Sequence, residues 1–339
     1  MSKPRAFLAT TVPDHVRQML EAACELRVFE GPGRRCSREQ FERVLPEVDG
    51  VLTSNGAHID HELIDAAPNL KVVSNFGVGY DNVDIPYATA HGLLVCNTPG
   101  VLSDAVADLT YGFMICLARG IVTSDQHAKG GHWSRGVTLP LGRDLRNSTL
   151  GILGLGRIGH VVAYRAAAFG MNVIYYDPIR DPIAEENGLA EYRERDDIFR
   201  EADFLTVHVF LDPTTRRHVG AREFGLMKRT AYLINTSRGG VIDQPALAEA
   251  LRSGTIAGAA LDVLEQEPPD ESDPILAAPN LIVAPHIGSA TAETRQAMAE
   301  LSARNLIAAI SGGTPEAMVN PEALEVRRKR VAVHGDARA

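Results

Sequence analysis

Cysteine is scarce in this chain, and the few cysteines form no recognisable motif. The 339 residues include four, all within the first 120 positions and with no C-x-x-C pair among them: Cys24, Cys36, Cys96 and Cys116. Scattered cysteines of this kind are typical of reduced thiols in a cytoplasmic protein. We therefore expect neither a disulfide framework nor a metal site.

Long apolar runs are also missing. No segment approaches the roughly 18 apolar residues of a membrane span, and residues 1–10 contain no apolar stretch typical of a signal peptide. The net charge is −9, and no basic stripe precedes the C-terminus, which argues against nucleic-acid binding. We expect a cytoplasmic protein that binds neither membranes nor nucleic acids, and whose basic residues 327–330 belong to a solvated tail.

What the sequence does contain is a repeated alternation of short apolar segments with helical patterns. Strand-like runs at 5–10, 50–53 and 70–74 are separated by helical stretches, and the same alternation resumes after residue 149. Alternation of this kind predicts parallel sheets covered by helices. The length of the chain is sufficient for two such α/β domains.

One stretch, 149–177, has the pattern of a dinucleotide-binding turn. Apolar residues 150–153 form a predicted strand, and Gly154, Gly156 and Gly159 match G-x-G-x-x-G at the start of a predicted helix. The first glycine permits a tight turn, the second lets the backbone approach a pyrophosphate, and the third lets helix and strand pack closely. The helix N-terminus then favours a bound phosphate. An ordinary strand-to-helix turn, in which the glycines serve packing alone, would have the same sequence pattern.

A carboxylate follows at the position where a ribose would bind. Asp177 closes the next predicted strand, 18 positions after Gly159. A carboxylate there can accept the ribose hydroxyls and would repel a 2′-phosphate. The sequence therefore favours NAD over NADP, although the nearby Arg180 could accommodate the phosphate.

A second glycine-rich loop, 75–84, directly follows a predicted strand in the first 100 residues. Its glycines, Gly77 and Gly79, would let backbone N–H groups point at a ligand, and a carboxylate suits such a loop. A simple glycine turn without a ligand fits the same residues.

Three ionisable residues lie at or just beyond the carboxyl ends of later strands: Arg238, Glu267 and His286. Alone, His286 reads as an ordinary histidine and Glu267 as an exposed loop acid. Together they suit reduction of a 2-oxo acid. Arg238 could bind the carboxylate and carbonyl oxygens, and His286 could donate the proton. Glu267 could fix the histidine tautomer and favour its charged form, while Asp262 could hold the nicotinamide amide.

The ordered set of motifs from about Val51 to Pro321 resembles the D-isomer-specific 2-hydroxyacid dehydrogenase family. The motifs are the glycine fingerprint and the segments 76–81, 97–102, 233–239, 260–268 and 285–289. The resemblance implies Arg238, Glu267 and His286 as a catalytic trio and Asp262 on the nicotinamide. It also implies substrate contacts from the N–H groups of Val78 and Gly79. We expect Asn55 to line the substrate pocket, and the further cofactor contacts to come from Arg157, Ile158, His208, Thr236 and Gly288.

The same resemblance predicts the architecture. It implies two Rossmann-like lobes with a cleft between them, the cofactor domain (102–287) being inserted into a substrate domain built from 1–101 and 288–321, with a tail at 322–339. It also implies a homodimer held mainly by the cofactor domain. Trp133, the only tryptophan, could anchor that interface or could cover its own core. One family glycine is replaced by Asn147, which tolerates the left-handed backbone region.

We expect an NAD-dependent, reversible reductase of a small 2-oxo acid, which within the family looks most like glyoxylate, hydroxypyruvate and hydroxyphenylpyruvate reductases. Two alternatives share the fold and the trio. One is a dehydrogenase of another small oxyanion such as phosphite. The other is a corepressor-like binding protein, which the absence of long disordered flanks disfavours.

Overall fold

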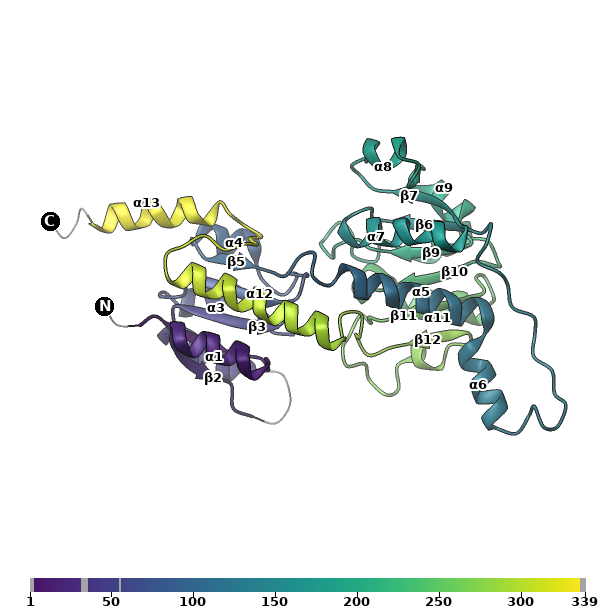
Figure 1. Cartoon of the computed structure of the whole chain (residues 1–339), viewed down its shortest axis with the longest axis horizontal. Helices are drawn as coiled ribbons and strands as arrows, with labels where there is room; N and C mark the ends of the chain where they lie inside the picture. The colour runs from purple at the N-terminus through teal and green to yellow at the C-terminus, as the bar shows by residue number, and fades with distance from the viewer. Residues whose placement is uncertain (1–2, 32–35, 55, 336–339) are drawn as a thin grey trace. The chain divides into compact units, whose positions relative to one another are not determined.

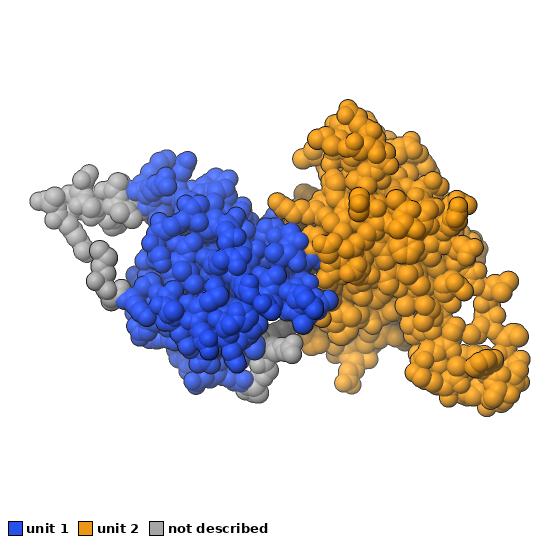
Figure 2. Space-filling view, viewed as in Figure 1, with its two compact units in different colours: residues 1–102, 291–339 blue, residues 103–290 orange. Residues whose placement is uncertain are grey.

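The computed structural model describes residues 3–31, 36–54 and 56–335, so the predicted pocket residue Asn55 lies outside the described residues. The chain divides into two compact units (Figure 2). Unit 1 comprises residues 1–102 and 291–339, and unit 2 comprises 103–290. Each unit contains one parallel sheet, so the prediction of two parallel α/β units is confirmed.

Unit 1 has a five-stranded sheet in the order β2-β1-β3-β4-β5, with parallel pairing throughout. Its strands are β1 (Arg5–Leu8), β2 (Glu25–Val28), β3 (Gly50–Ser54), β4 (Val72–Phe76) and β5 (Leu94–Cys96). Its helices are α1 (Asp14–Ala23), α2 (Arg38–Val44), α3 (His61–Ala66), α4 (Ile85–Ala90), α12 (Ala292–Ile310) and α13 (Ala323–Gly335), with a 3₁₀ turn η1 (Leu45–Glu47).

Helices cover both faces of this sheet, as Figure 1 shows for α1, α12 and α4. One core combines α1 and α12 with strand residues such as Leu52, and the other combines α2, α3 and α4 with residues such as Val51. The alternation along β3 explains the arrangement, because successive side chains point to opposite faces. Helix α12 lies so close to β3 that a Cβ on Gly50 would be 2.6 Å from Leu306 Cδ1.

Unit 2 has a seven-stranded parallel sheet in the order β12-β11-β10-β9-β6-β7-β8. Its strands are β6 (Thr149–Leu153), β7 (Asn172–Tyr176), β8 (Glu191–Tyr192), β9 (Phe204–Val207), β10 (Tyr232–Asn235), β11 (Gly258–Leu261) and β12 (Leu281–Val283). Its helices are α5 (Ser103–Arg119), α6 (Ile121–Lys129), α7 (Arg157–Ala166), α8 (Pro182–Glu186), α9 (Arg195–Glu201), α10 (Ala221–Leu226) and α11 (Gln244–Arg252), with 3₁₀ turns η2 (Ala167–Phe169), η3 (Gly239–Val241) and η4 (Pro274–Ala277).

The direction of chain progression reverses at β6 in this sheet. The chain moves outward from β6 to β7 and β8, then returns to pair β9 on the other side of β6. In open α/β sheets, ligands bind at the carboxyl ends of strands beside such a reversal. The glycine turn that follows β6 is therefore at the position where this fold binds ligands.

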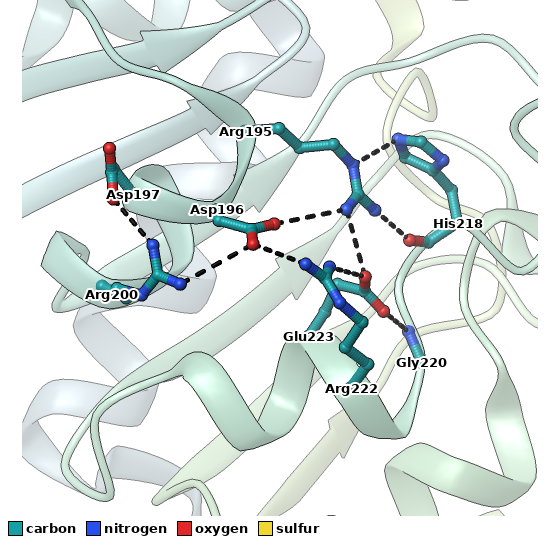
Figure 3. A network of polar contacts seen from close by, with 8 residues as sticks. All are labelled: Arg195, Asp196, Asp197, Arg200, His218, Gly220, Arg222 and Glu223. Carbon is teal, nitrogen blue, oxygen red and sulfur yellow. Dashed lines mark hydrogen bonds and ion pairs between the residues drawn. The ribbon is translucent and has the colours of Figure 1, made fainter.

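A network of charged side chains joins α9 to α10 in unit 2 (Figure 3). Arg195 donates to Glu223 Oε1 at 3.1 Å, to the His218 carbonyl at 2.6 Å and to His218 Nε2 at 3.0 Å. Arg222 bonds the same Glu223 oxygen at 2.8 Å. Burial, and then the charge of Arg195, lower the pKa of His218. The ring is therefore neutral and accepts a hydrogen bond, and the network stabilises the packing of the two helices.

The C-terminal tail is not simply solvated, contrary to the prediction. It contains α13, in which Ala323 is fully buried and the side chain of Arg327 is bonded to the backbone just before β4 and β5. Arg327 donates to the carbonyls of Gly92 and Lys71. A solvated tail was predicted from charge alone, but the long apolar stem of arginine can be buried when its guanidinium meets carbonyl groups.

Helix α6 projects from unit 2, and the segment 130–148 that follows it contains no helix or strand (Figure 1). No residue of α6 is buried. Within the described part of the chain, no single helix could span a membrane. Only α5 and α6 together, bent by 59°, meet the length and composition test.

Candidate active site

The glycine turn after β6 has the geometry that a bound pyrophosphate requires. Gly154 has a φ of +97°, and a Cβ there would be 2.8 Å from the His208 carbonyl oxygen. A Cβ on Gly159 would be 2.4 Å from the Gly154 oxygen, so helix and turn are in direct contact. A Cβ on Gly156 would meet nothing within 4 Å, which leaves that side of the turn open.

Helix α7 begins at this open glycine. Its N-cap is Gly156, and no side chain caps the N-terminus. Arg157 and Ile158 are the first two residues of α7, so their N–H groups belong to the unbonded first turn. A turn open at Gly156 and an uncapped helix fit the phosphates of a dinucleotide.

Asp177 closes β7 beside the turn. Its carboxylate accepts the Leu155 N–H at 3.0 Å and the Ile179 N–H at 3.0 Å. Each oxygen keeps a further lone pair, so the carboxylate can still accept hydrogen bonds from ribose hydroxyls. The neighbouring Arg180 bonds Glu185 and lies 4.5 Å above the ring of Tyr192. Its guanidinium is therefore held by groups other than a 2′-phosphate.

His286 and Glu267 form a direct pair just beyond the ends of β12 and β11. The His286 Nδ1 atom lies 2.7 Å from Glu267 Oε2, and the side chains are 38% and 28% exposed. The other Glu267 oxygen accepts the Leu264 N–H at 3.1 Å. Burial by itself would raise the pKa of Glu267, but the hydrogen bond and charge of His286, the Leu264 N–H and the charge of Arg238 outweigh burial and lower it. Glu267 is therefore an anion that holds Nδ1 of the ring and leaves Nε2 for chemistry.

Arg238 follows β10 and approaches the same loop. A Cβ on Gly239 would lie 1.9 Å from the Leu264 carbonyl carbon, so the backbone after Arg238 is pressed against the segment that leads to Glu267. The Arg238 carbonyl accepts from Asn235 Nδ2 at 2.9 Å. The three residues of the predicted trio thus lie at the carboxyl ends of neighbouring strands in unit 2.

Asp262 is buried at the end of β11 and holds the His286 loop. Its two oxygens accept the N–H groups of Ile287 and Gly288, each at 2.7 Å. Burial raises the pKa of Asp262 despite these two bonds. His286 itself has a φ of +55°, a conformation that few residues other than glycine adopt. The anchoring by Asp262 explains how this conformation is maintained, a role that the sequence had not indicated.

The remaining predicted cofactor residues lie around the same sheet edge. Thr236 follows β10 and its hydroxyl is 3.3 Å from that of Thr110 on α5. A Cβ on Gly288 would be 2.9 Å from Asp262 Oδ2, so this glycine is required for close packing. The His208 Nε2 atom is 2.9 Å from Thr206 Oγ1. Burial lowers the pKa of His208 to about 3, so this ring is neutral.

The predicted carboxylate loop lies in unit 1, directly after β4. The carbonyls of Gly77, Val78 and Gly79 each accept a hydrogen bond from the body of the unit. A trans peptide places its N–H opposite its carbonyl. The N–H groups of Val78 and Gly79 therefore point away from the groups that hold the loop.

Several buried amides support these sites and were missed in the sequence. Asn235 bonds the backbone around Arg238, and Gln244 on α11 accepts the Glu265 N–H at 3.0 Å. The buried Asn75 and Asn82 bond each other, and Asn75 and the partly buried Asn97 bond the carboxylate loop. The available signal was an asparagine at the end of an apolar strand, where a buried amide needs partners. Among the described residues, no group of three His, Cys, Asp or Glu residues is arranged to bind a metal ion.

Comparisons with known proteins agree on one family. The profile of the D-isomer specific 2-hydroxyacid dehydrogenase NAD binding domain matches residues 111–288. A glyoxylate reductase of Thermococcus litoralis is 43% identical over 327 residues, covering 95% of this chain and 98% of that protein. A glyoxylate reductase of Thermofilum pendens is 42% identical over 330 residues, covering 96% and 97%.

Solved structures of similar proteins cover nearly the whole chain. The glyoxylate reductase from Paecilomyes thermophila matches with a TM-score of 0.86 and 34% identity, covering 95% of this chain and 99% of that one. The NADPH-dependent glyoxylate/hydroxypyruvate reductase from Sinorhizobium meliloti, solved with NADP and malonate, matches with a TM-score of 0.83 and 33% identity. The match covers 95% of this chain and 98% of that one.

Proposed function

This chain belongs to the D-isomer-specific 2-hydroxyacid dehydrogenase family, and we propose that it interconverts a small 2-oxo acid and its D-2-hydroxy acid, with His286 as proton donor and acceptor. The protein is an enzyme of this class, and it uses a nicotinamide cofactor and a small-molecule substrate. Glyoxylate and hydroxypyruvate are the proposed substrates. The observation that carries the proposal is the His286–Glu267 pair of 2.7 Å at the strand ends that also carry Arg238.

In the proposed reaction the bound nicotinamide supplies or accepts a hydride at the substrate carbon. Arg238 binds the substrate oxygens and stabilises the charge that develops on the carbonyl oxygen. His286 delivers a proton from Nε2 to that oxygen, while Glu267 holds Nδ1 and stabilises the positive charge of the ring before transfer. The N–H groups of Val78 and Gly79 bind the substrate carboxylate.

We propose NAD rather than NADP as the preferred cofactor. Asp177 would repel a 2′-phosphate, and Arg180 is held by Glu185 and by the ring of Tyr192. The solved relative from Sinorhizobium meliloti is described as NADPH-dependent, so the family does not decide the choice. The proposal rests on these residues of this chain.

We also propose that the enzyme is a homodimer in which α6 and the segment 130–148 bind the partner copy. Its apolar side chains face solvent to an unusual extent: Trp133 is 76% exposed and Leu141 is fully exposed, and Val137 and Ile121 are 50% and 45% exposed. Exposed aromatic and aliphatic groups concentrated on one projecting segment are typical of an interface.

The substrate class is tested by following NADH oxidation with glyoxylate, hydroxypyruvate, pyruvate and an aromatic 2-oxo acid. We expect turnover with glyoxylate or hydroxypyruvate and a D-configured product from the latter. Turnover of none of the four would overturn the proposed function. Repeating the panel with NADPH measures the cofactor preference directly.

A further inference from the structure

A pair of buried asparagines lies behind the carboxylate loop of unit 1. Asn75 at the end of β4 is fully buried, and Asn82 is only 3% exposed. Asn75 Nδ2 donates to Asn82 Oδ1 at 2.9 Å, which joins the two flanks of the loop through their side chains. Burying two amides is unfavourable unless their hydrogen bonds are satisfied.

Each amide also bonds a backbone carbonyl. Asn75 Nδ2 donates to the Gly79 carbonyl at 2.6 Å, and Asn82 Nδ2 donates to the Ala57 carbonyl at 2.8 Å. Gly79 is within the carboxylate loop, and Ala57 is within the loop that follows β3. The pair therefore ties together two of the loops at the carboxyl ends of neighbouring strands.

Two other donors fix the two carbonyls that precede Gly79 in the loop. The Thr98 N–H bonds the Gly77 carbonyl at 3.0 Å, and Asn97 Nδ2 bonds the Val78 carbonyl at 2.8 Å. Three successive carbonyls are thus directed into the unit, and trans geometry directs the following N–H groups the opposite way. Successive N–H groups that point the same way form an anion-binding concavity.

We propose that Asn75 and Asn82 are positioning residues for substrate binding: their bond to the Gly79 carbonyl fixes the peptide plane next to the two planes that carry the N–H groups of Val78 and Gly79, and so keeps the carboxylate loop in the conformation that binds the substrate carboxylate. The role of these N–H groups rests on the proposed function, and the role of the asparagine pair goes beyond it. The pair does not touch the substrate. It acts by fixing the Gly79–Tyr80 peptide plane, beside the two planes that Thr98 and Asn97 hold.

The test is the isosteric change Asn82→Asp, with Asn82→Ala as a second variant. In the aspartate, one oxygen can still accept from Asn75, but the other replaces an amide donor and faces the carbonyl of Ala57 and Asn75 Oδ1, which lie 2.8 and 3.4 Å from the present nitrogen. A buried carboxyl group that faces acceptors favours its protonated form, whose O–H can replace the lost donor.

We expect the KM for glyoxylate of Asn82→Asp to rise about tenfold at pH 8 and to return towards the wild-type value at pH 5.5, because a lost buried hydrogen bond has an effect of this order. Asn82→Ala should raise this KM at both pH values. In both variants the KM for NADH and kcat should change by less than about twofold, because neither the trio nor the glycine turn is altered. An unchanged glyoxylate KM in both variants would overturn the proposal.

Asn320→Asp is the matched control. Asn320 is a buried amide of the same unit, 2% exposed, which bonds the Leu93 carbonyl at 3.0 Å and the Val95 N–H at 2.7 Å. This variant should lower the melting temperature as Asn82→Asp does, and should leave the glyoxylate KM unchanged. An equal rise in KM in the control would mean that the effect reflects general loosening of unit 1, which would also overturn the proposal.

A binding measurement separates this inference from the proposed activity. The amide resonances of Val78 and Gly79 in the ¹⁵N-labelled, NAD-saturated full-length protein are followed during titration with oxalate. We expect both to shift, and Asn82→Ala to need about tenfold more oxalate. If the wild type reduces no 2-oxo acid but this pattern is seen, the proposed function fails and the positioning role stands. If the resonances do not respond, or respond equally in both proteins, the positioning role fails.

Discussion

Replacing Glu267 by glutamine tests the proposed proton transfer most directly. The carboxylate now serves two donors with two oxygens, the His286 ring at 2.7 Å and the Leu264 N–H at 3.1 Å. Glutamine has a single acceptor oxygen, so one donor loses its partner and the NH₂ group faces it. Hydrogen bonds to charged groups contribute about 1.5–3 kcal/mol. At about 1.4 kcal/mol for each factor of ten, kcat/KM for glyoxylate reduction should fall about 10- to 150-fold.

The assay is steady-state NADH oxidation from pH 5.5 to 9, with glyoxylate below its KM. The loss should be present throughout this range, because the glutamine no longer offers both donors a carboxylate oxygen. Glu265→Gln is the control, because Glu265 is two residues away in the same loop and pairs with Arg217 at 3.2 Å. We expect the control to stay within about twofold of wild type. A folded Glu267→Gln enzyme that keeps more than half of the wild-type kcat/KM at every pH would refute the reasoning.

Three further predictions concern the cofactor, the interface and acid stability. Asp177→Ala should raise the kcat/KM for NADPH relative to NADH about tenfold, since removing one like charge beside a 2′-phosphate changes binding by about 1.4 kcal/mol; an unchanged ratio would contradict the assignment. Trp133→Ser should weaken the proposed dimer at least tenfold in sedimentation measurements, while a monomeric wild type would exclude it. The lowered pKa of His208 means that the folded state binds fewer protons than the unfolded state between about pH 3 and 6.5. The free energy of unfolding should therefore fall by up to about 1.4 kcal/mol per pH unit below 6.5, and urea unfolding of His208→Asn should show a shallower acid slope.

The fold was largely predictable because its main signals are local. Apolar strands that alternate with helical patterns encode parallel sheets, and the spacing of Gly154, Gly156 and Gly159 encodes the turn after β6. Asn147, expected to tolerate the left-handed region, has a φ of +62°. These features depend on short segments whose conformation is decided by their own residues and their immediate neighbours.

Features that depend on distant partners were not predictable. The tail was predicted to be solvated because it is rich in basic residues. The Arg327 side chain instead donates to the carbonyl of Gly92, 235 positions earlier in the chain. The short β8 and the helix α6, which has no buried residue, lack the hydrophobic periodicity that identifies elements. Asn75 and Asn82 are polar residues whose roles come from the groups around them, so no role was predicted for them. Asp262 was predicted to contact the nicotinamide, but its anchoring of the His286 loop depends on N–H groups 25 and 26 positions away.

The glycine after Arg238 shows how local and distant causes differ within one motif. Arg238 became a candidate because it lies beyond the carboxyl end of a predicted strand, and two glycines follow it. The structure gives the first of these glycines a reason of its own: any side chain at Gly239 would collide with the carbonyl of Leu264. The close approach brings the chain after β10 against the chain after β11, and with it the charge of Arg238 close enough to lower the pKa of Glu267. Because the contact joins the segments after two strands, a substitution at Gly239 would displace Arg238 and the Glu267 loop together. We therefore expect such a substitution to impair the functions of Arg238 and Glu267 at the same time.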